Sequence, residues 1–83
     1  MKSESLKEIK SWLGDDGIMF FKHLKEKYGR IDTIFMEDGI PHPVHFREGM
    51  RVRNFLRELD EFKYWDTNKL DDEWVGIIEE VIK

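Results

Sequence analysis

Residues 31–46 read Ile-Asp-Thr-Ile-Phe-Met-Glu-Asp-Gly-Ile-Pro-His-Pro-Val-His-Phe. Two runs rich in β-branched and aromatic residues flank Asp38-Gly39, and an Asp-Gly pair in that place is typical of a two-residue type I′ turn. The sequence therefore predicts an antiparallel β-hairpin, and this hairpin decides the predicted fold class.

Pro41 and Pro43 restrict the register of the hairpin, because proline has no N–H to donate to a sheet. If Glu37 and Ile40 pair across the turn, both prolines fall at positions that need no inward N–H. The second strand is then an edge of the sheet. This register places one set of side chains on the core face: Ile31, Thr33, Phe35, Ile40, His42, Val44 and Phe46.

Helical periodicity is found on both sides of the hairpin. A capping box at Ser5 predicts the start of a first helix, and Gly14 is expected to end it in a left-handed conformation. A second helix is expected up to Gly29, a third over residues 48–62, and a fourth after an N-cap at Asp71. The expected buried stripes are Leu6, Ile9 and Leu13, then Ile18, Phe21, Leu24 and Tyr28, then Val52, Phe55, Leu56, Leu59 and Phe62, then Trp74, Ile77, Ile78 and Val81.

The predicted fold is a small single α+β domain over residues 1–83, in the order α-α-β-β-α-α. Its helices are expected to pack on one face of the two-stranded antiparallel hairpin, because a hairpin of two strands is only marginally stable alone.

Composition excludes several classes of protein. The chain has 83 residues and no cysteine, which excludes disulfides and thiolate catalysis. It contains no apolar run approaching the ~20 residues of a membrane helix, so a cytoplasmic location without membrane contact is expected. The formal net charge is −4, and the acidity is concentrated in residues 58–83.

The segment after the hairpin is unusually basic for this chain. It carries four arginines, and a third helix that buries Val52 is expected to turn all of them to solvent. Arg47 and Arg51 lie near the helix N-terminus, where the helix dipole disfavours cations. The candidate contact surface consists of His45, Arg47, Arg51, Arg53 and Arg57. An ordinary solvated face, with Gly49 as N-cap and some arginines paired to nearby acids, is the competing interpretation.

A non-catalytic protein-interaction or regulatory domain is the function that this segment favours. Arginine forks suit carboxylates, so the expected partner is an acidic protein or a second copy of the chain. Nucleic acid is the alternative ligand, and the acids of the last third of the chain disfavour it.

Other candidate sites are weaker. His42 and His45 are three residues apart on a predicted strand, so they point to opposite faces and predict no metal site or cofactor. A metal-dependent hydrolase using these histidines and Glu48 is a third alternative, and no common catalytic motif supports an enzyme. Tyr64 and Trp65 are expected to close the core, or else to serve as exposed anchors for a partner.

Overall fold

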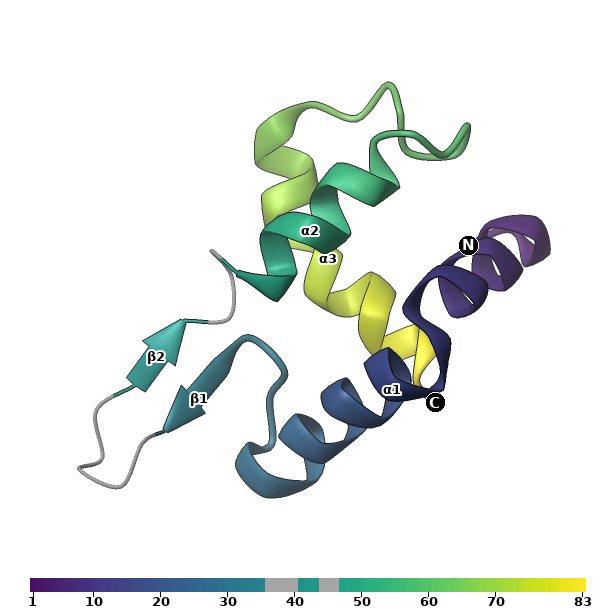
Figure 1. Cartoon of the computed structure of the whole chain (residues 1–83). Coiled ribbons are helices and arrows are strands. Elements are labelled where there is room, and N and C mark those ends of the chain that lie inside the picture. The colour runs from purple at the N-terminus through teal and green to yellow at the C-terminus, as the bar shows by residue number, and fades with distance from the viewer. Residues whose placement is uncertain (36–40, 44–46) are drawn as a thin grey trace.

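The computed structural model describes residues 1–35, 41–43 and 47–83. Three helices are found in this part of the chain: α1 (Ser3–Tyr28), α2 (Glu48–Leu56) and α3 (Thr67–Val81), with 26, 9 and 15 residues. Two strands of three residues each, β1 (Thr33–Phe35) and β2 (Pro41–Pro43), pair between α1 and α2 in the chain order (Figure 1). None of the described helices combines the length and the hydropathy needed to cross a membrane.

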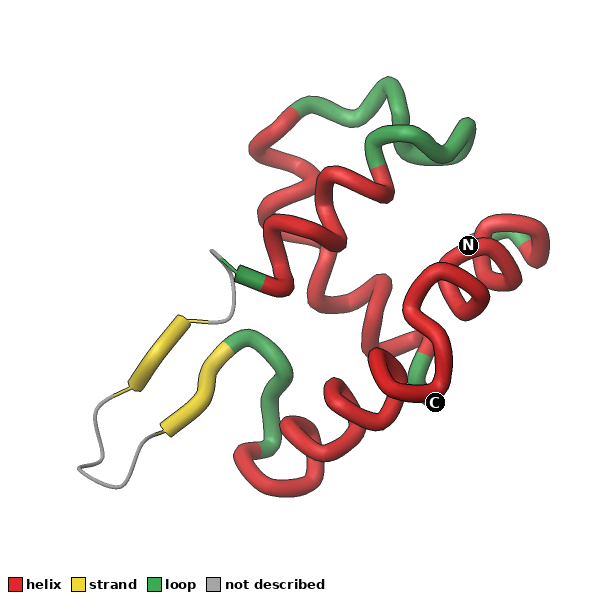
Figure 2. Tube along the Cα trace, viewed as in Figure 1, coloured by secondary structure: helices red, strands yellow, loops and turns green. Residues whose placement is uncertain are grey.

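The predicted α+β class is wrong, because the fold is helical. The three helices pack on one another, whereas the two short strands extend to one side and form no layer beneath them (Figure 2). The physical reason is that the apolar stripes of the helices cover each other. The interior therefore needs no sheet face, and a β-hairpin does not define this fold.

The predicted register is also wrong. β1 and β2 are antiparallel, with Ile34 opposite His42, whereas the sequence-based register placed Phe35 opposite His42. A slip of one residue exchanges the two faces of a strand relative to its partner. The prediction that Thr33, Phe35 and His42 share one face of the hairpin is therefore wrong. The Asp38-Gly39 turn lies outside the described residues.

Gly14 divides α1 into two helical halves that bend sharply at this point (Figure 1). Its backbone has φ 68° and ψ 177°, a region open essentially to glycine alone. The predicted break at Gly14 is confirmed, and φ is positive as expected. The ψ angle is extended, however, whereas the predicted left-handed conformation has a ψ near that of a left-handed helix. The predicted start at Ser5 is wrong: α1 begins at Ser3, and Ser5 is buried.

Two boundaries after the strands also differ from expectation. α2 ends at Leu56, and the chain continues in tight turns. One of them is closed by a 3.0 Å hydrogen bond from the Glu58 N–H to the Phe55 carbonyl. α3 begins at Thr67 because the carboxylate of Asp66 accepts the Lys69 N–H at 2.7 Å. The predicted N-cap at Asp71 is therefore wrong, and Asp71 lies inside the helix.

The core is centred on Trp74, whose side chain is fully buried. Its ring meets Phe21 of α1 edge to face at a centroid distance of 6.5 Å, and α3 packs against both other helices. The predicted stripes supply most of this core, since Val52, Leu56, Leu59, Phe62, Ile77, Ile78 and Val81 are buried.

Glu61 fastens the N-terminal end of α1 from a distant part of the chain. Its carboxylate accepts the backbone N–H of Lys2 at 2.8 Å and the Ser5 hydroxyl. Partial burial alone would raise the pKa of Glu61, but these two hydrogen bonds and the nearby positive charges outweigh it and hold the pKa below the ordinary value of 4.5. This contribution to stability is present above pH 4.5 and is lost as the pH falls through the folded-state pKa.

Glu61→Gln is expected to flatten the fall of the free energy of unfolding as the pH drops below 4.5, the ordinary pKa of a glutamate. Glutamine cannot ionise, so its hydrogen bonds to the end of α1 do not change with pH. Thermal unfolding across that range measures the effect, with the exposed Glu58→Gln as the control of equal charge change. An unaltered pH profile in Glu61→Gln would show that the carboxylate does not hold this helix end.

Candidate protein-interaction surface

Arg47 and Arg51 lie one helical turn apart at the N-terminal end of α2, and both are exposed. Within residues 1–35, 41–43 and 47–83, no ion pair is recorded for either guanidinium. The positive end of the α2 dipole adds to their charge. This end of α2 therefore favours an anionic group supplied from outside the described residues.

Arg53 is the exception among the four predicted arginines, because only 5% of the residue is exposed. Its Nε lies 3.3 Å from Oδ1 of Asp71. The prediction that all four guanidinium groups face solvent is wrong for this residue. α2 turns Gly49, Val52, Arg53 and Leu56 inward, and the early start of α3 leaves Asp71 available as a partner for the buried charge.

Asp71→Asn is expected to destabilise the fold by about 1–3 kcal/mol, because it leaves a buried guanidinium with a weaker partner. Arg53→Met is expected to cost less, since it removes the charge that needs compensation. Urea denaturation of both variants measures the difference, with the exposed Asp72→Asn as control. A greater loss in Arg53→Met than in Asp71→Asn would contradict this account of the pair.

Arg57 is exposed at the C-terminal end of α2, where its Nη1 donates to Oδ1 of Asn54 at 2.7 Å. A cation at this end of a helix is stabilised by the dipole, so Arg57 is accounted for within the chain. His45 lies outside the described residues, and so does the side chain of His42. The predicted five-residue surface is thus reduced to Arg47 and Arg51 as neighbouring exposed cations.

An apolar groove of about 360 Å³ adjoins Arg51. It lies between α1 and the first turns of α2, and we call it the Trp12 groove. Its lining residues are Trp12, Leu13, Asp16, Gly17, Phe20, Phe21, Glu48, Arg51 and Val52. Both halves of α1 contribute, because the bend at Gly14 brings the end of the first half beside the start of the second.

Aromatic rings form much of the wall of this groove. Trp12 is 39% exposed and stacks on Phe55 of α2, with ring centroids 4.5 Å apart and planes 6° from parallel. The other face of such a stacked ring pair is a good surface for a further ring. In the sequence, Trp12 and Phe20 only border the apolar stripes of residues 6–13 and 18–28, so helical periodicity alone does not single them out as groove residues.

The rim of the Trp12 groove carries charges of both signs. Arg51 offers five N–H donors, while Asp16 and Glu48 offer carboxylate acceptors. This arrangement suits a ligand that has an acid beside a hydroxyl or amide donor. Among the described residues, no three His, Asp or Glu side chains gather to hold a metal ion.

Tyr64 and Trp65, the two candidate anchors, have different surroundings. Trp65 is half-buried and meets Phe62 edge to face at 5.0 Å, as expected for a residue that closes the core. Tyr64 is 87% exposed, and the Lys63 ammonium group lies 5.1 Å from its ring centroid. The expectation that both rings close the core is therefore wrong for Tyr64.

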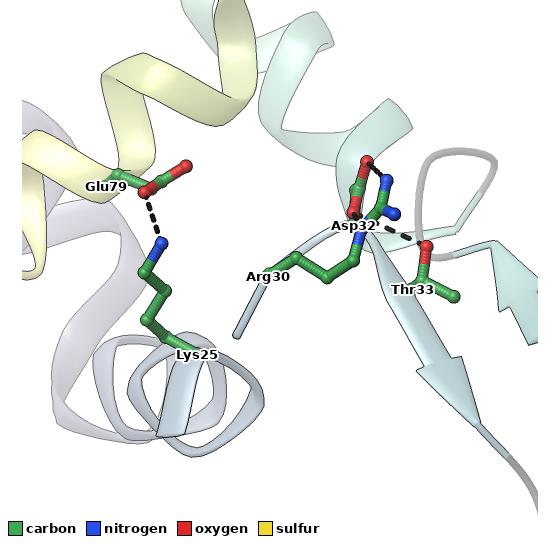
Figure 3. A network of polar contacts seen from close by, with 5 residues as sticks. All are labelled: Lys25, Arg30, Asp32, Thr33 and Glu79. Carbon is green, nitrogen blue, oxygen red and sulfur yellow. Dashed lines mark hydrogen bonds and ion pairs between the residues drawn. The ribbon is translucent and has the colours of Figure 1, made fainter. Parts of the chain in front are cut away.

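Lys25 and Arg30, by contrast, are paired within the chain (Figure 3). Lys25 Nζ joins α1 to α3 through Glu79 Oε2 at 2.8 Å, and Arg30 Nη2 donates to Asp32 Oδ2 at 2.8 Å. The hydrogen bond from Arg30 holds the pKa of the Asp32 carboxyl below its ordinary value. These pairs have evident structural roles, which distinguishes them from Arg47 and Arg51.

A comparison with known proteins adds nothing to this description, since no protein-family model, curated protein or solved structure matches the chain.

Proposed function

We propose that this chain is a non-catalytic protein-interaction or regulatory domain that binds an acidic segment of a protein partner. The contact surface consists of Arg47, Arg51 and the Trp12 groove. The observation that carries the proposal is the position of Arg51, an exposed guanidinium on the rim of an aromatic groove. The proposal retains the cytoplasmic location expected from the sequence.

The chemistry of the surface favours a peptide with two features. An aromatic or large apolar side chain would fill the groove, where it would be shielded from water between Trp12 and Phe20. A neighbouring carboxylate would accept hydrogen bonds from Arg51, and charge-assisted bonds of this kind contribute about 1.5–3 kcal/mol. Interface hot spots commonly join such an apolar anchor to an arginine.

The balance of charge disfavours nucleic acid as the ligand. With Arg53 buried, Arg51 is on the rim of the groove, Arg47 lies exposed one turn before it, and Arg57 lies at the far end of α2. α3 exposes Asp72, Glu73 and Glu80, and the chain carries a net charge of −4. A polyanion lying across this surface would be repelled by those acids.

Fluorescence polarisation with a labelled peptide of glutamates around one tyrosine tests the proposal. Wild-type protein is expected to bind it, and Arg47→Glu with Arg51→Glu is expected to weaken binding about tenfold or more, which corresponds to the loss of one charge-assisted contact. Both residues are exposed, so far-UV circular dichroism of the variant should be unchanged.

Lys7→Glu with Lys10→Glu is the matched control, because it makes the same charge change at exposed positions of α1. Its affinity is expected to stay within about twofold of wild type. Equal weakening in both double variants, or no binding by wild type, would contradict the proposal. Tighter binding of a single-stranded oligonucleotide than of the peptide would replace it with the nucleic-acid alternative.

A further inference from the structure

We propose that the segment occupying the Trp12 groove belongs to a second copy of this chain. The segment is the acidic turn over residues 57–66, which we call the Tyr64 turn. This inference rests on the proposed function, because it uses the same groove and the same Arg51, and it names the partner.

The backbone of the Tyr64 turn is held by hydrogen bonds and by packing on the core. The Phe62 N–H donates to the Leu59 carbonyl and the Trp65 N–H to the Phe62 carbonyl, both at 3.0 Å. Phe62 is buried and Trp65 packs against it, which leaves Tyr64 outward with 87% of its surface exposed. Because the backbone on both sides of Tyr64 is already ordered, binding through this turn costs less backbone entropy than binding through an unstructured segment.

Charge on the Tyr64 turn complements Arg51. The segment carries four acids and two basic residues, and the side chain of Asp60 is 93% exposed, with Lys63 3.1 Å away as its intrachain partner. An exposed pair of this kind contributes little to stability, so Asp60 is available for a second cation. Arg51 of another copy supplies such a cation with a better hydrogen-bonding geometry than lysine has.

The Trp12 groove matches the tyrosine ring in size and in chemistry. A cleft of about 360 Å³ is large enough for a small ligand and accepts a phenol ring between Trp12 and Phe20. Aromatic pairs of this kind attract one another beyond the burial of their apolar area. The Tyr64 hydroxyl can donate to the carboxylate of Asp16 or Glu48 at the rim.

The contact joins two molecules, because within one chain Tyr64 is exposed and does not line the Trp12 groove. Glu48 and Arg51 lie in the first turns of α2, whereas the Tyr64 turn extends beyond its C-terminal end (Figure 1). The helix is a rigid spacer of about 1.5 Å per residue between them. Each copy therefore offers one groove and one turn, and reciprocal exchange of the two closes a symmetric dimer.

Sedimentation equilibrium between roughly 10 μM and roughly 1 mM protein tests the inference. Wild type is expected to show a monomer–dimer equilibrium, and Tyr64→Ala and Arg51→Glu are each expected to weaken the dimer at least about tenfold. Both positions are exposed, so neither change should alter folding. Met19→Ala, at an exposed apolar residue outside the groove lining, is the control and should dimerise as wild type does.

Mixing the two defective variants gives the sharpest result. Tyr64→Ala keeps an intact groove and Arg51→Glu keeps an intact turn, so a mixed dimer has one intact contact and one contact that lacks both side chains. Because Tyr64 and Arg51 act in the same contact, losing the second adds little to losing the first. The mixture is therefore expected to associate more strongly than either variant alone. Monomeric wild type at every concentration, or a dimer unchanged by Tyr64→Ala, would overturn the inference. Monomeric wild type that still binds the acidic tyrosine peptide would leave the proposed function intact, whereas no peptide binding would remove both.

Discussion

Trp74→Ala is expected to lower the free energy of unfolding by about 3–5 kcal/mol. The side chain is fully buried at the centre of the core, where it contacts Phe21 edge to face. Alanine would leave a cavity that the surrounding helices cannot fill. A domain of this size has a total stability of about 4–12 kcal/mol, so the variant should be close to unfolding at ambient temperature.

Urea denaturation followed by far-UV circular dichroism measures this loss. Trp74→Phe keeps part of the ring volume and should retain a cooperative transition at a cost of roughly 1–3 kcal/mol. Trp12→Ala is the matched control, because Trp12 is 39% exposed, and it should cost about 1 kcal/mol from the lost stack on Phe55. If Trp74→Ala had a free energy of unfolding equal to or higher than that of Trp12→Ala, Trp74 would not be the centre of the core.

Gly49→Ala is expected to destabilise the protein by about 1–3 kcal/mol, although alanine is the better helix former by about 1 kcal/mol. A Cβ atom at Gly49 would lie 2.7 Å from Cζ2 and 3.0 Å from Cη2 of Trp74. The indole is rigid and fully buried, so it cannot move aside as a flexible side chain would. Gly49 therefore permits the close approach of α2 to α3.

Gly76→Ala provides the matched control for the same substitution in a helix. Gly76 is exposed in α3, and a Cβ there would meet nothing within 4 Å, so alanine should stabilise the fold by about 0.5–1 kcal/mol. In a Trp74→Phe background, which lacks the outer ring of the indole, Gly49→Ala should lose most of its cost. Equal effects of Gly49→Ala in both backgrounds would contradict the contact, because a double-mutant cycle would then show no coupling.

Helical periodicity was a reliable guide to the interior of this protein. It selected Trp74, Ile78, Val52 and Leu56, all of which are buried, and glycine chemistry located the bend at Gly14. Apolar spacing determines which face of a helix can be removed from water, and that requirement holds whatever the helix packs against. Most of the core could therefore be predicted without knowledge of the fold class, although the buried Leu70 and Ile82 were on no predicted stripe.

The β-hairpin failed as a guide to the fold class because its pattern is local. Residues 31–46 show good strand and turn signals, but a local pattern does not say whether the paired segment forms a layer of the core. Ile31 is buried and joins the start of this segment to the helices. The helices cover one another, and this tertiary packing outweighs the local signal.

The remaining errors concern partners that are distant in the sequence. Arg53 was assigned to solvent because a helix that buries Val52 was expected to turn it outward, and its partner Asp71 was assigned to a helix cap. The acceptor for the Lys2 N–H is Glu61, 59 positions away, and no local capping rule finds such a pair. The Trp12 groove needs both the bend at Gly14 and the placement of α2, so the sequence could indicate Arg51 but not the cleft beside it.

The indole N–H signals of the three tryptophans report directly on the contact surface in solution. On titration with the acidic tyrosine peptide, the nuclear magnetic resonance signal of Trp12 is expected to shift and saturate, while that of the buried Trp74 stays in place. In Arg47→Glu with Arg51→Glu, the Trp12 signal should shift only at about tenfold higher peptide concentration or more. A Trp12 signal that does not respond in wild type, or a response confined to Trp65, would contradict an interaction surface built on Arg51 and the groove.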